Sequence, residues 1–260
     1  LVSHWVLVGF VHGVMNTDNM TISGETIDYG PCAFMEHFDP NAVFSSIDTS
    51  GRYAYGNQPA IAQWNLARLA DALLPLIDAD AESAAQRAGA AVEAFAERFD
   101  FHWTSVLRLK LGLDGSSGDD RALADDYLTL LRRHRIDFTL AFARLADAAQ
   151  GKTTPLRTLF GGAAAARELW LTRWRERTLA IGKSPDELAA ALRSANPIYI
   201  PRNHHVESAL AAAVERDDLA PFERLLRVLQ HPFDEHAADS ALAEPAPAEQ
   251  TENYRTFCGT

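Results

Sequence analysis

The sequence predicts a mainly α-helical protein. From residue 59 onward, apolar residues recur at spacings of three and four between helix-start and helix-end signals. One segment alone, Thr21–Ile27, is strand-like, with Ile22 and Ile27 as its inward positions. No internal repeat is evident, and a chain of 260 residues can form one large domain or two small ones.

The first 58 residues hold fewer regular elements than the rest of the chain. The apolar run Leu1–Val11 predicts a helix that leads into a polar loop, and Thr21–Ile27 predicts one arm of a short hairpin. Residues 28–58 are rich in Asp, Pro, Ser and Gly, which predicts a long irregular segment, and long ordered loops tend to be functional. The aromatic residues expected to anchor this segment by packing are Phe34, Phe38, Phe44, Tyr53 and Tyr55.

The remaining residues predict successive helices. Pro59 begins the first, which ends near Pro75; its expected inward residues are Ile61, Trp64, Leu69 and Leu73. A long helix from Asp80 follows, broken by Gly112 and the glycine and serine residues at 114–118. Later helices are expected at 119–134, 137–149, from Thr154, around Trp170 and Trp174, and at 185–194, 203–216 and 221–230. Ala237–Gln250, rich in Ala, Glu and Pro, predicts a flexible tether.

Composition excludes some partners. The net charge of −11 argues against nonspecific nucleic-acid binding, which needs a basic surface. The apolar runs are short and broken by charges, which argues against a membrane span. The first residues lack the pattern of a secretory signal, and we expect a cytoplasmic protein.

The most informative segment runs from His12 to Asn19 and is followed by Asp28-Tyr-Gly. Its layout is that of a protein kinase catalytic loop and the metal-binding Asp that follows it. Asn19 stands five positions after Val14, the kinase spacing, but Val14 occupies the place of the kinase catalytic Asp. Asp18 stands beside the Asn instead.

These residue types suit a magnesium nucleotide. Mg²⁺ prefers oxygen ligands and keeps several positions for water and phosphate oxygens. The amide of Asn19 and the carboxylate of Asp28 are therefore the candidate metal ligands. Asp18 is the candidate catalytic residue, because a carboxylate can orient or deprotonate an incoming hydroxyl.

Longer motifs carry a resemblance to a known family. Residues 12–20 and 26–31, then 51–59, 64–66, 196–197 and 201–204, and Cys258, occur in the order typical of the selenoprotein O family (SelO, called YdiU in bacteria). The resemblance implies a protein-kinase-like C-terminal lobe with a short β-hairpin at the metal site and a helical C-terminal extension. It implies divisions at 1–150 for the lobe, 151–236 for the extension and 237–260 for a flexible tail.

The resemblance also implies the chemistry. Members of this pseudokinase family are adenylyltransferases that move AMP from ATP to Ser, Thr or Tyr hydroxyls of proteins, with UTP as a second donor in bacteria. It matches Asp18 to the proton acceptor, and Asn19 and Asp28 to ligands of Mg²⁺, with Mn²⁺ as an alternative. It also matches Asp28 to a residue that contacts ATP. Family members carry an N-terminal lobe that grips the phosphates; because no such motif is found here, we expect a C-terminal portion that is inactive alone.

The cysteines are expected to be free thiols unless the family pattern holds. The resemblance implies redox behaviour at Cys258, paired in some members with a Cys at the position of Phe44 here. Cys32 is the alternative partner for a Cys258 bond.

Two other functions stay open. The chain could be a non-catalytic helical interaction module, or a kinase-type phosphotransferase with a displaced base, although Val14 argues against the latter. The Gly-Lys pairs at 151 and 182 lack the earlier glycine of a phosphate-binding loop and predict helix boundaries instead. Arg52, Asn57, Arg202 and Asn203 are expected to be structural, and adjacent His204 and His205 to point apart, which makes a shared metal ion improbable.

Overall fold

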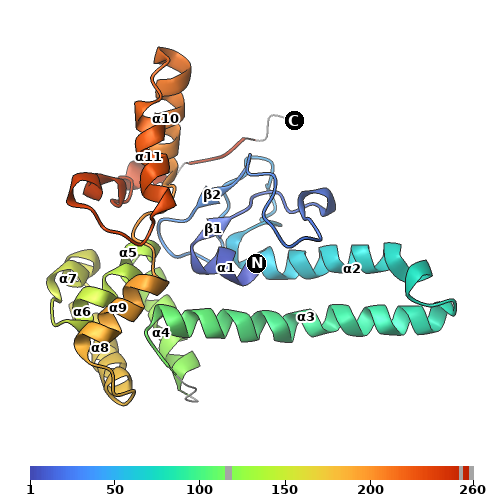
Figure 1. Cartoon of the computed structure of the whole chain (residues 1–260), viewed down its shortest axis with the longest axis horizontal. Coiled ribbons are helices and arrows are strands. Elements are labelled where there is room, and N and C mark those ends of the chain that lie inside the picture. Colours follow the sequence, from blue (N-terminus) through green and yellow to red (C-terminus); the bar gives the residue numbers. More distant parts are fainter. Residues whose placement is uncertain (115–118, 252–253, 258–260) are drawn as a thin grey trace. The chain divides into compact units, whose positions relative to one another are not determined.

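The computed structural model describes residues 1–114, 119–251 and 254–257 (Figure 1). The described chain is mainly helical, as the sequence predicts, and forms two compact units. Unit 1 comprises residues 1–33, 40–106 and the described residues from Arg255 on, and unit 2 comprises residues 34–39 and the described part of 107–254. The predicted divisions at 150 and 236 both fall within unit 2.

Unit 1 begins with helix α1 (Val2–Leu7) and strand β1 (Phe10–Val11). The predicted helix over Leu1–Val11 ends early, because Gly9 adopts φ +77° and the chain leaves the helix there. A one-turn 3₁₀ helix η1 (Thr17–Asn19) follows, and β1 pairs with β2 (Ala33–Phe34), where the chain passes to unit 2. A second 3₁₀ turn, η2 (Tyr55–Asn57), then leads into α2 (Gln58–Ile77) and α3 (Ala81–Lys110).

The predicted strand at Thr21–Ile27 is wrong. The segment turns at Ser23, where the Gly24 N–H donates to the Thr21 carbonyl and Gly24 adopts φ +76°. The Ile22 side chain, predicted to face inward, is 88% exposed. The two short strands flank this loop, and the long irregular segment predicted for 28–58 is confirmed apart from β2 and η2.

The inward face predicted for α2 is also wrong. Trp64, Leu69 and Leu73 are exposed, and the buried residues are Gln58, Ala62 and Asn65. The polar side chains face inward because they hydrogen-bond the backbone of the loop before Asn19. Apolar spacing alone assigned the wrong side of this helix.

Unit 2 contains the last residues of α3 and the remaining helices, whose predicted positions are largely confirmed. They are α4 (Asp120–Arg133), α5 (Phe138–Ala143), α6 (Leu145–Ala149), α7 (Thr154–Phe160), α8 (Ala164–Leu179), α9 (Pro185–Ala195), α10 (Asn203–Arg216) and α11 (Ala220–Gln230). Ser184 and Glu187 form a capping box at the start of α9, which agrees with the helix boundary predicted near Gly182. Trp170 and Trp174 are buried and stacked, and each indole N–H donates to a main-chain carbonyl.

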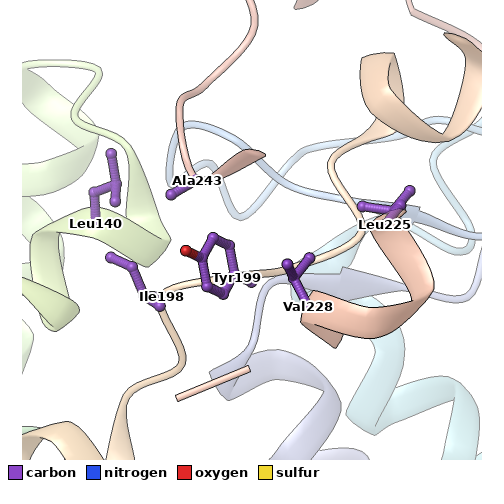
Figure 2. Close-up of a cluster of buried hydrophobic side chains, with 6 residues drawn as sticks. All are labelled: Leu140, Ile198, Tyr199, Leu225, Val228 and Ala243. Carbon is purple, nitrogen blue, oxygen red and sulfur yellow. The ribbon is translucent and has the colours of Figure 1, made fainter. Parts of the chain in front are cut away.

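One apolar cluster of unit 2 contradicts the prediction that Ala237–Gln250 is a flexible tether. This segment contains the 3₁₀ helix η3 (Ala237–Leu242) and the start of α12 (Ala248–Thr251). Ala243 is buried in a cluster drawn in Figure 2, whose other members are Leu140, Ile198, Tyr199, Leu225 and Val228. The Asp239 carboxylate accepts a 2.8 Å hydrogen bond from Arg224. Apolar burial and this ion pair order a segment whose composition alone predicts disorder.

Over the parts of the chain that the structure describes, no helix combines the length and apolar character needed to cross a bilayer.

Candidate active site

The candidate site is built on the segment from His12 to Val14, which the first turn of α2 holds in place. The His12 N–H donates to Gln58 Oε1 over 2.9 Å, and Gln58 Nε2 donates to the Phe10 carbonyl over 2.9 Å. All three residues are buried. Two hydrogen bonds from one buried amide therefore fix the backbone that enters the polar loop.

Asn19, a candidate metal ligand, is tied to this segment. It lies in η1, and its Nδ2 donates to the Val14 carbonyl over 3.0 Å. With the nitrogen used in this way, Oδ1 is the atom that remains for a metal ion. Val14 is buried and offers its carbonyl, which gives a structural role to the position where kinases keep an Asp.

Asp28, the second candidate ligand, is tied to the same segment through its neighbour. His12 Nε2–H donates to the Ile27 carbonyl over 2.9 Å. Burial lowers the pKa of His12, so the ring is neutral at pH 7 and keeps the proton at Nε2 that this bond requires. Asp28 itself is exposed and adopts φ +55°. A left-handed Asp is uncommon, and such backbone conformations concentrate at functional sites.

Gly13 lets the loop that carries Asp28 pack closely against residues 12–14, the anchor of the site. It adopts φ +90°, and a Cβ atom placed there would lie 2.4 Å from the Pro31 carbonyl oxygen. No larger residue fits without moving one of the two segments. Residues 12–14 therefore hold Asn19 on one side and the loop around Asp28 on the other.

Asp18, the candidate proton acceptor, lies in η1 beside Asn19 and is exposed to solvent. The Tyr53 hydroxyl donates to Asn16 Oδ1 over 2.6 Å and holds the residue that precedes η1. The side chain of Asp18 is thus reachable by an incoming group, on a turn whose start is fixed.

The donor set fits a magnesium nucleotide. Asn19 and Asp28 offer one amide oxygen and one carboxylate, both hard ligands. Within the ranges that the structure describes, no group of three or more His, Cys, Asp or Glu side chains could enclose a metal ion. A cation at Asn19 and Asp28 would therefore need phosphate oxygens and water as its other ligands.

Sequence reasoning missed Gln58, Asn65 and Tyr53 as residues that position the loop. Gln58 lies in the motif at 51–59 and Asn65 in the motif at 64–66. Polar residues at these motif positions of a predicted helix could have indicated that its buried face is polar. Arg52 and Asn57 have the structural roles predicted for them: the Arg52 guanidinium lies 4.9 Å from the Trp64 ring centre, and Asn57 Nδ2 donates to the Gly51 carbonyl.

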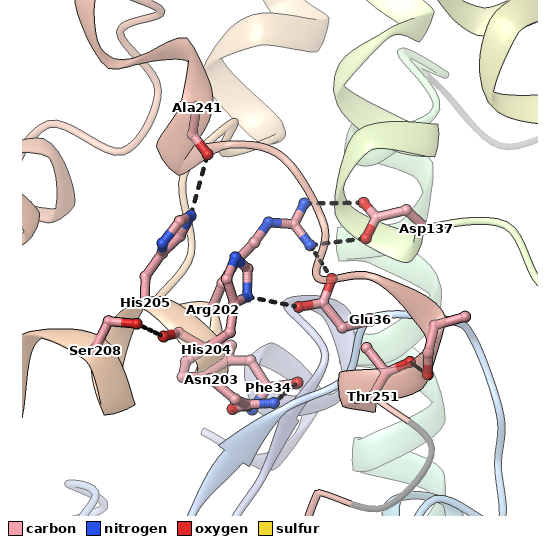
Figure 3. Close-up of polar contacts among 11 residues, drawn as sticks. Phe34, Glu36, Asp137, Arg202, Asn203, His204, His205, Ser208, Ala241 and Thr251 are labelled. Carbon is pink, nitrogen blue, oxygen red and sulfur yellow. Dashed lines mark hydrogen bonds and ion pairs between the residues drawn. The ribbon is translucent and has the colours of Figure 1, made fainter. Parts of the chain in front are cut away.

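A second polar cluster, in unit 2, surrounds Arg202 (Figure 3). Its guanidinium donates to both carboxylate oxygens of Asp137, over 2.8 and 3.1 Å, and to Glu36. The Asn203 amide exchanges two hydrogen bonds with the backbone of Phe34. The structural roles predicted for Arg202 and Asn203 are confirmed: Arg202 joins the start of α10 to the start of α5, and Asn203 joins α10 to β2.

The ring centres of the adjacent His204 and His205 lie 3.8 Å apart. His205 Nε2 donates to the Ala241 carbonyl, and His204 Nδ1 lies 3.9 Å from Glu36, so each ring is directed at a different partner.

The C-terminal segment pairs with unit 1 next to Cys32. Thr256 exchanges main-chain hydrogen bonds with Phe44 and Ser46, and its hydroxyl donates to the Pro31 carbonyl over 2.6 Å. Cys32 is a free thiol whose pKa is raised to about 11 by burial. Cys258 lies outside the described residues, so a Cys32–Cys258 bond stays a prediction.

Comparison with known proteins identifies the family of the chain. Residues 1–230 match the family model described as protein adenylyltransferase SelO. The chain therefore belongs to the SelO/YdiU family.

Relatives share the whole length of the chain. Proteins named protein nucleotidyltransferase YdiU are 58% identical in Cereibacter sphaeroides (strain ATCC 17029 / ATH 2.4.9), 54% in Chromobacterium violaceum and 50% in Rhizobium etli. Each alignment covers 100% of this chain but 52%, 54% and 52% of the respective relative. The chain spans about half the length of the curated relatives that it matches.

Proposed function

We propose that this chain supplies the catalytic loop and metal-binding loop of a protein adenylyltransferase. The enzyme would move AMP from ATP to Ser, Thr or Tyr hydroxyls of other proteins, with UTP as an alternative donor. The observation that carries the proposal is the shared anchor at residues 12–14. One side of this anchor holds Asn19 through the Val14 carbonyl, and the other holds the backbone just before Asp28 through His12.

The residues take distinct roles in this proposal. Asp18 accepts the proton of the acceptor hydroxyl, whose oxygen attacks the α-phosphorus of ATP. The bond from the α-phosphorus to the bridging oxygen of the β-phosphate breaks, and pyrophosphate leaves. Asn19 Oδ1 and the Asp28 carboxylate would hold Mg²⁺, or Mn²⁺, which when bound neutralises phosphate charge.

The remaining chain would support this loop as part of a protein-kinase-like C-terminal lobe. Family membership and the mainly helical fold support that assignment. Because the relatives are about twice as long, we infer that phosphate-gripping groups come from a lobe outside this chain and that this chain is inactive alone. A kinase-type reaction is less favoured, because Val14 presents an apolar side chain where that reaction needs a carboxylate.

The experiment compares two matched substitutions in the same loop, made in this chain joined to the residues that precede it in the gene. Asp28→Asn removes a candidate ligand's charge, and Asn tolerates the left-handed conformation that position 28 requires. Glu25→Gln makes the equivalent change at an exposed residue whose carboxylate accepts a hydrogen bond from the Ser23 hydroxyl. Calorimetry would measure binding of Mg²⁺·ATP, and labelled ATP would report transfer to protein.

Asp28→Asn should abolish magnesium-dependent ATP binding, while Glu25→Gln leaves it within twofold. Label should reach protein from α-labelled ATP and not from γ-labelled ATP. Transfer of the γ label would identify a kinase instead. Equal ATP affinity in the two variants would show that Asp28 does not bind the metal ion, and this result would refute the proposal.

A further inference from the structure

Two arginines of unit 1 lie against one tryptophan of α2. The guanidinium carbon of Arg52 is 4.9 Å from the Trp64 ring centre, and that of Arg68 is 5.4 Å from it. Trp64 is 43% exposed, and both arginines are exposed. These three residues, the arginine cluster, place two positive charges at the surface of a chain whose net charge is −11.

The position of Arg52 is fixed at both ends of the residue. The two carboxylate oxygens of Asp48 accept hydrogen bonds of 2.8 Å from the main-chain N–H groups of Arg52 and Tyr53. At the other end, the guanidinium lies over the Trp64 ring and 5.6 Å from the Tyr53 ring centre. A guanidinium held on aromatic rings keeps N–H donors for another partner. Arg52 is therefore ordered before a ligand arrives, which lowers the entropy cost of binding.

Both guanidiniums of the cluster can accept an anionic ligand. Among the residues that the structure describes, no carboxylate forms an ion pair with Arg52. Arg68 pairs with Asp71 at 3.0 Å, but the two side chains are 50% and 59% exposed. Exposed pairs of this kind contribute little to stability, so a ligand can replace Asp71 at small cost.

The cluster lies next to the start of η1, the turn that carries the proposed proton acceptor. The Tyr53 hydroxyl, one residue from Arg52, donates to Asn16 Oδ1 over 2.6 Å, and Asn16 immediately precedes η1. Arg68 and the first residue of η1, Thr17, line one cavity. An anion bound by the two guanidiniums would lie beside the place where an acceptor hydroxyl loses its proton.

The proposed metal loop is held by an earlier part of the same segment. His12 donates to the Ile27 carbonyl, and Gly13 packs closely against Pro31. The arginine cluster is connected instead to residues 16 and 17, beyond this anchor. This arrangement favours the acceptor, and not the triphosphate at the metal ion, as the source of the anion.

The chemistry of the cluster defines the group that it binds. A guanidinium binds a carboxylate with two parallel hydrogen bonds, and acidic side chains are the common anions of a polypeptide. The hydroxyl residue of the acceptor is uncharged and can approach Asp18, while an acidic neighbour meets the arginines. Because the chain is acidic as a whole, a local positive site also orients an acidic polypeptide that the remaining surface repels.

We propose that the arginine cluster binds the carboxylate of an aspartate or glutamate that lies within a few positions of the acceptor's hydroxyl residue. The enzyme would then select acidic acceptor sequences and hold them beside Asp18. The proposal deepens the proposed function and rests on it. It gives Arg52, besides its structural contact with Trp64, a role in acceptor selection that the transfer step does not use.

The test compares two arginines of unit 1 with similar exposure and the same kind of partner. The side chains of Arg68 and Arg87 are 50% and 65% exposed, and each pairs with one aspartate. Arg68 lies on the Trp64 ring, whereas Arg87 donates to the Ile77 carbonyl at the end of α2. Arg68→Gln and Arg87→Gln therefore remove the same charge inside and outside the cluster. Arg52→Gln removes the second cation of the cluster.

The protein is this chain joined to the residues that precede it in the gene, at low ionic strength, where charge pairs are screened least. The probe is a fluorescein-labelled nonapeptide with a central serine and with glutamate and glycine alternating on both sides. A second probe has glutamine in place of each glutamate. Fluorescence anisotropy measures the affinity of each probe, and the ratio of the two affinities is the glutamate preference.

The unmodified protein should bind the glutamate probe at least tenfold more tightly than the glutamine probe. Arg52→Gln and Arg68→Gln should each lower this preference at least fivefold, and the double variant should abolish it. Arg87→Gln should leave it within twofold. Thermal unfolding checks that each variant folds. If Arg52→Gln does not fold, Arg68→Gln decides the test, because its side chain lies at the surface of α2.

Two results would overturn the acidic acceptor site. One is equal affinity of the unmodified protein for the two probes. The other is an equal loss of preference in Arg68→Gln and Arg87→Gln, because net charge alone would then explain the binding. Loss of Mg²⁺·ATP binding in Arg52→Gln, with the glutamate preference unchanged, would assign the arginines to the nucleotide phosphates and also overturn the proposal.

The proposed function is tested separately by Asp28→Asn. A missing glutamate preference leaves the result of that metal test unchanged. A protein that prefers the glutamate probe through Arg52 and Arg68 but transfers no label from ATP would retain the acidic-peptide site and refute the adenylyltransferase function.

Discussion

Replacing Arg202 by methionine should strongly destabilise unit 2. The guanidinium is 0% exposed and contacts two carboxylates, Glu36 and Asp137, that are 6% and 5% exposed. Removing one partner of a buried ion pair destabilises a protein by about 3–5 kcal/mol, because an uncompensated charge stays buried. Asp137 Oδ1 would still accept a hydrogen bond from the Leu140 N–H at the start of α5. Glu36 would lose the Arg202 guanidinium that pairs with it in Figure 3.

Protonation should moderate this loss. Burial, together with the nearby Asp137 carboxylate, already raises the pKa of Glu36 to about 7 despite the opposing effect of Arg202. Because a raised acid pKa means that the folded state holds the proton more tightly, this contribution to stability is present below the ordinary pKa of 4.5 and is lost as the pH rises through about 7. We therefore expect a loss of about 3 kcal/mol at pH 7, larger at pH 8 and smaller at pH 5.

The assay is urea unfolding followed by tryptophan fluorescence, with a substitution in an exposed ion pair as the control. Arg224 pairs with the buried Asp239, so a better matched control is Arg173→Met: Arg173 pairs with Asp126 at 2.6 Å, and the two side chains are 46% and 54% exposed. Exposed pairs contribute about 0–1 kcal/mol, so the control should lose no more than that. Equal losses in the two variants, or a deficit in Arg202→Met that does not change between pH 5 and 8, would refute the assigned role of the buried ion pair.

Two further predictions concern other parts of the chain. Gly13→Ala should lower the free energy of unfolding by at least ~1 kcal/mol and abolish Mg²⁺·ATP binding, because its Cβ would meet Pro31; Gly24→Ala has a similar φ with no atom within 4 Å, and calorimetry should show that it keeps binding. Burial lowers the pKa of Lys110 from 10.5 to about 7, so its contribution to stability is full above 10.5 and is lost as the pH falls toward 7. Unfolding between pH 7 and 9 should therefore show stability rising by up to ~1.4 kcal/mol per pH unit, and Lys110→Met should remove that rise; an unchanged slope would contradict it.

Local signals predicted most of unit 2. Helix α9 has a capping box and Pro185 at its first position, and α8 has Trp170 and Trp174 four residues apart, so the sequence of each helix contains its own evidence. The polar segment around Asn19 was likewise identified by residue type and spacing.

Long-range contacts explain what the sequence could not predict. Arg202 meets Glu36 and Asp137 across separations of 166 and 65 residues, and no local pattern encodes that pairing. The inward face of α2 was misjudged for a related reason: Gln58 and Asn65 face inward to bond a backbone about 50 residues earlier. Apolar periodicity identifies a helix well but misplaces its buried face when polar side chains supply the contacts.

The pairing of Thr256 with residues 44–46 has a consequence for biogenesis. Unit 1 includes residues 1–33, yet part of its edge comes from residues more than 200 positions later in the chain. On the ribosome, this unit cannot acquire these hydrogen bonds until residue 256 has been synthesised, long after residues 44–46 have emerged. A nascent chain stalled before residue 255 would present an open main-chain edge at 44–46, which chaperones would have to shield until release.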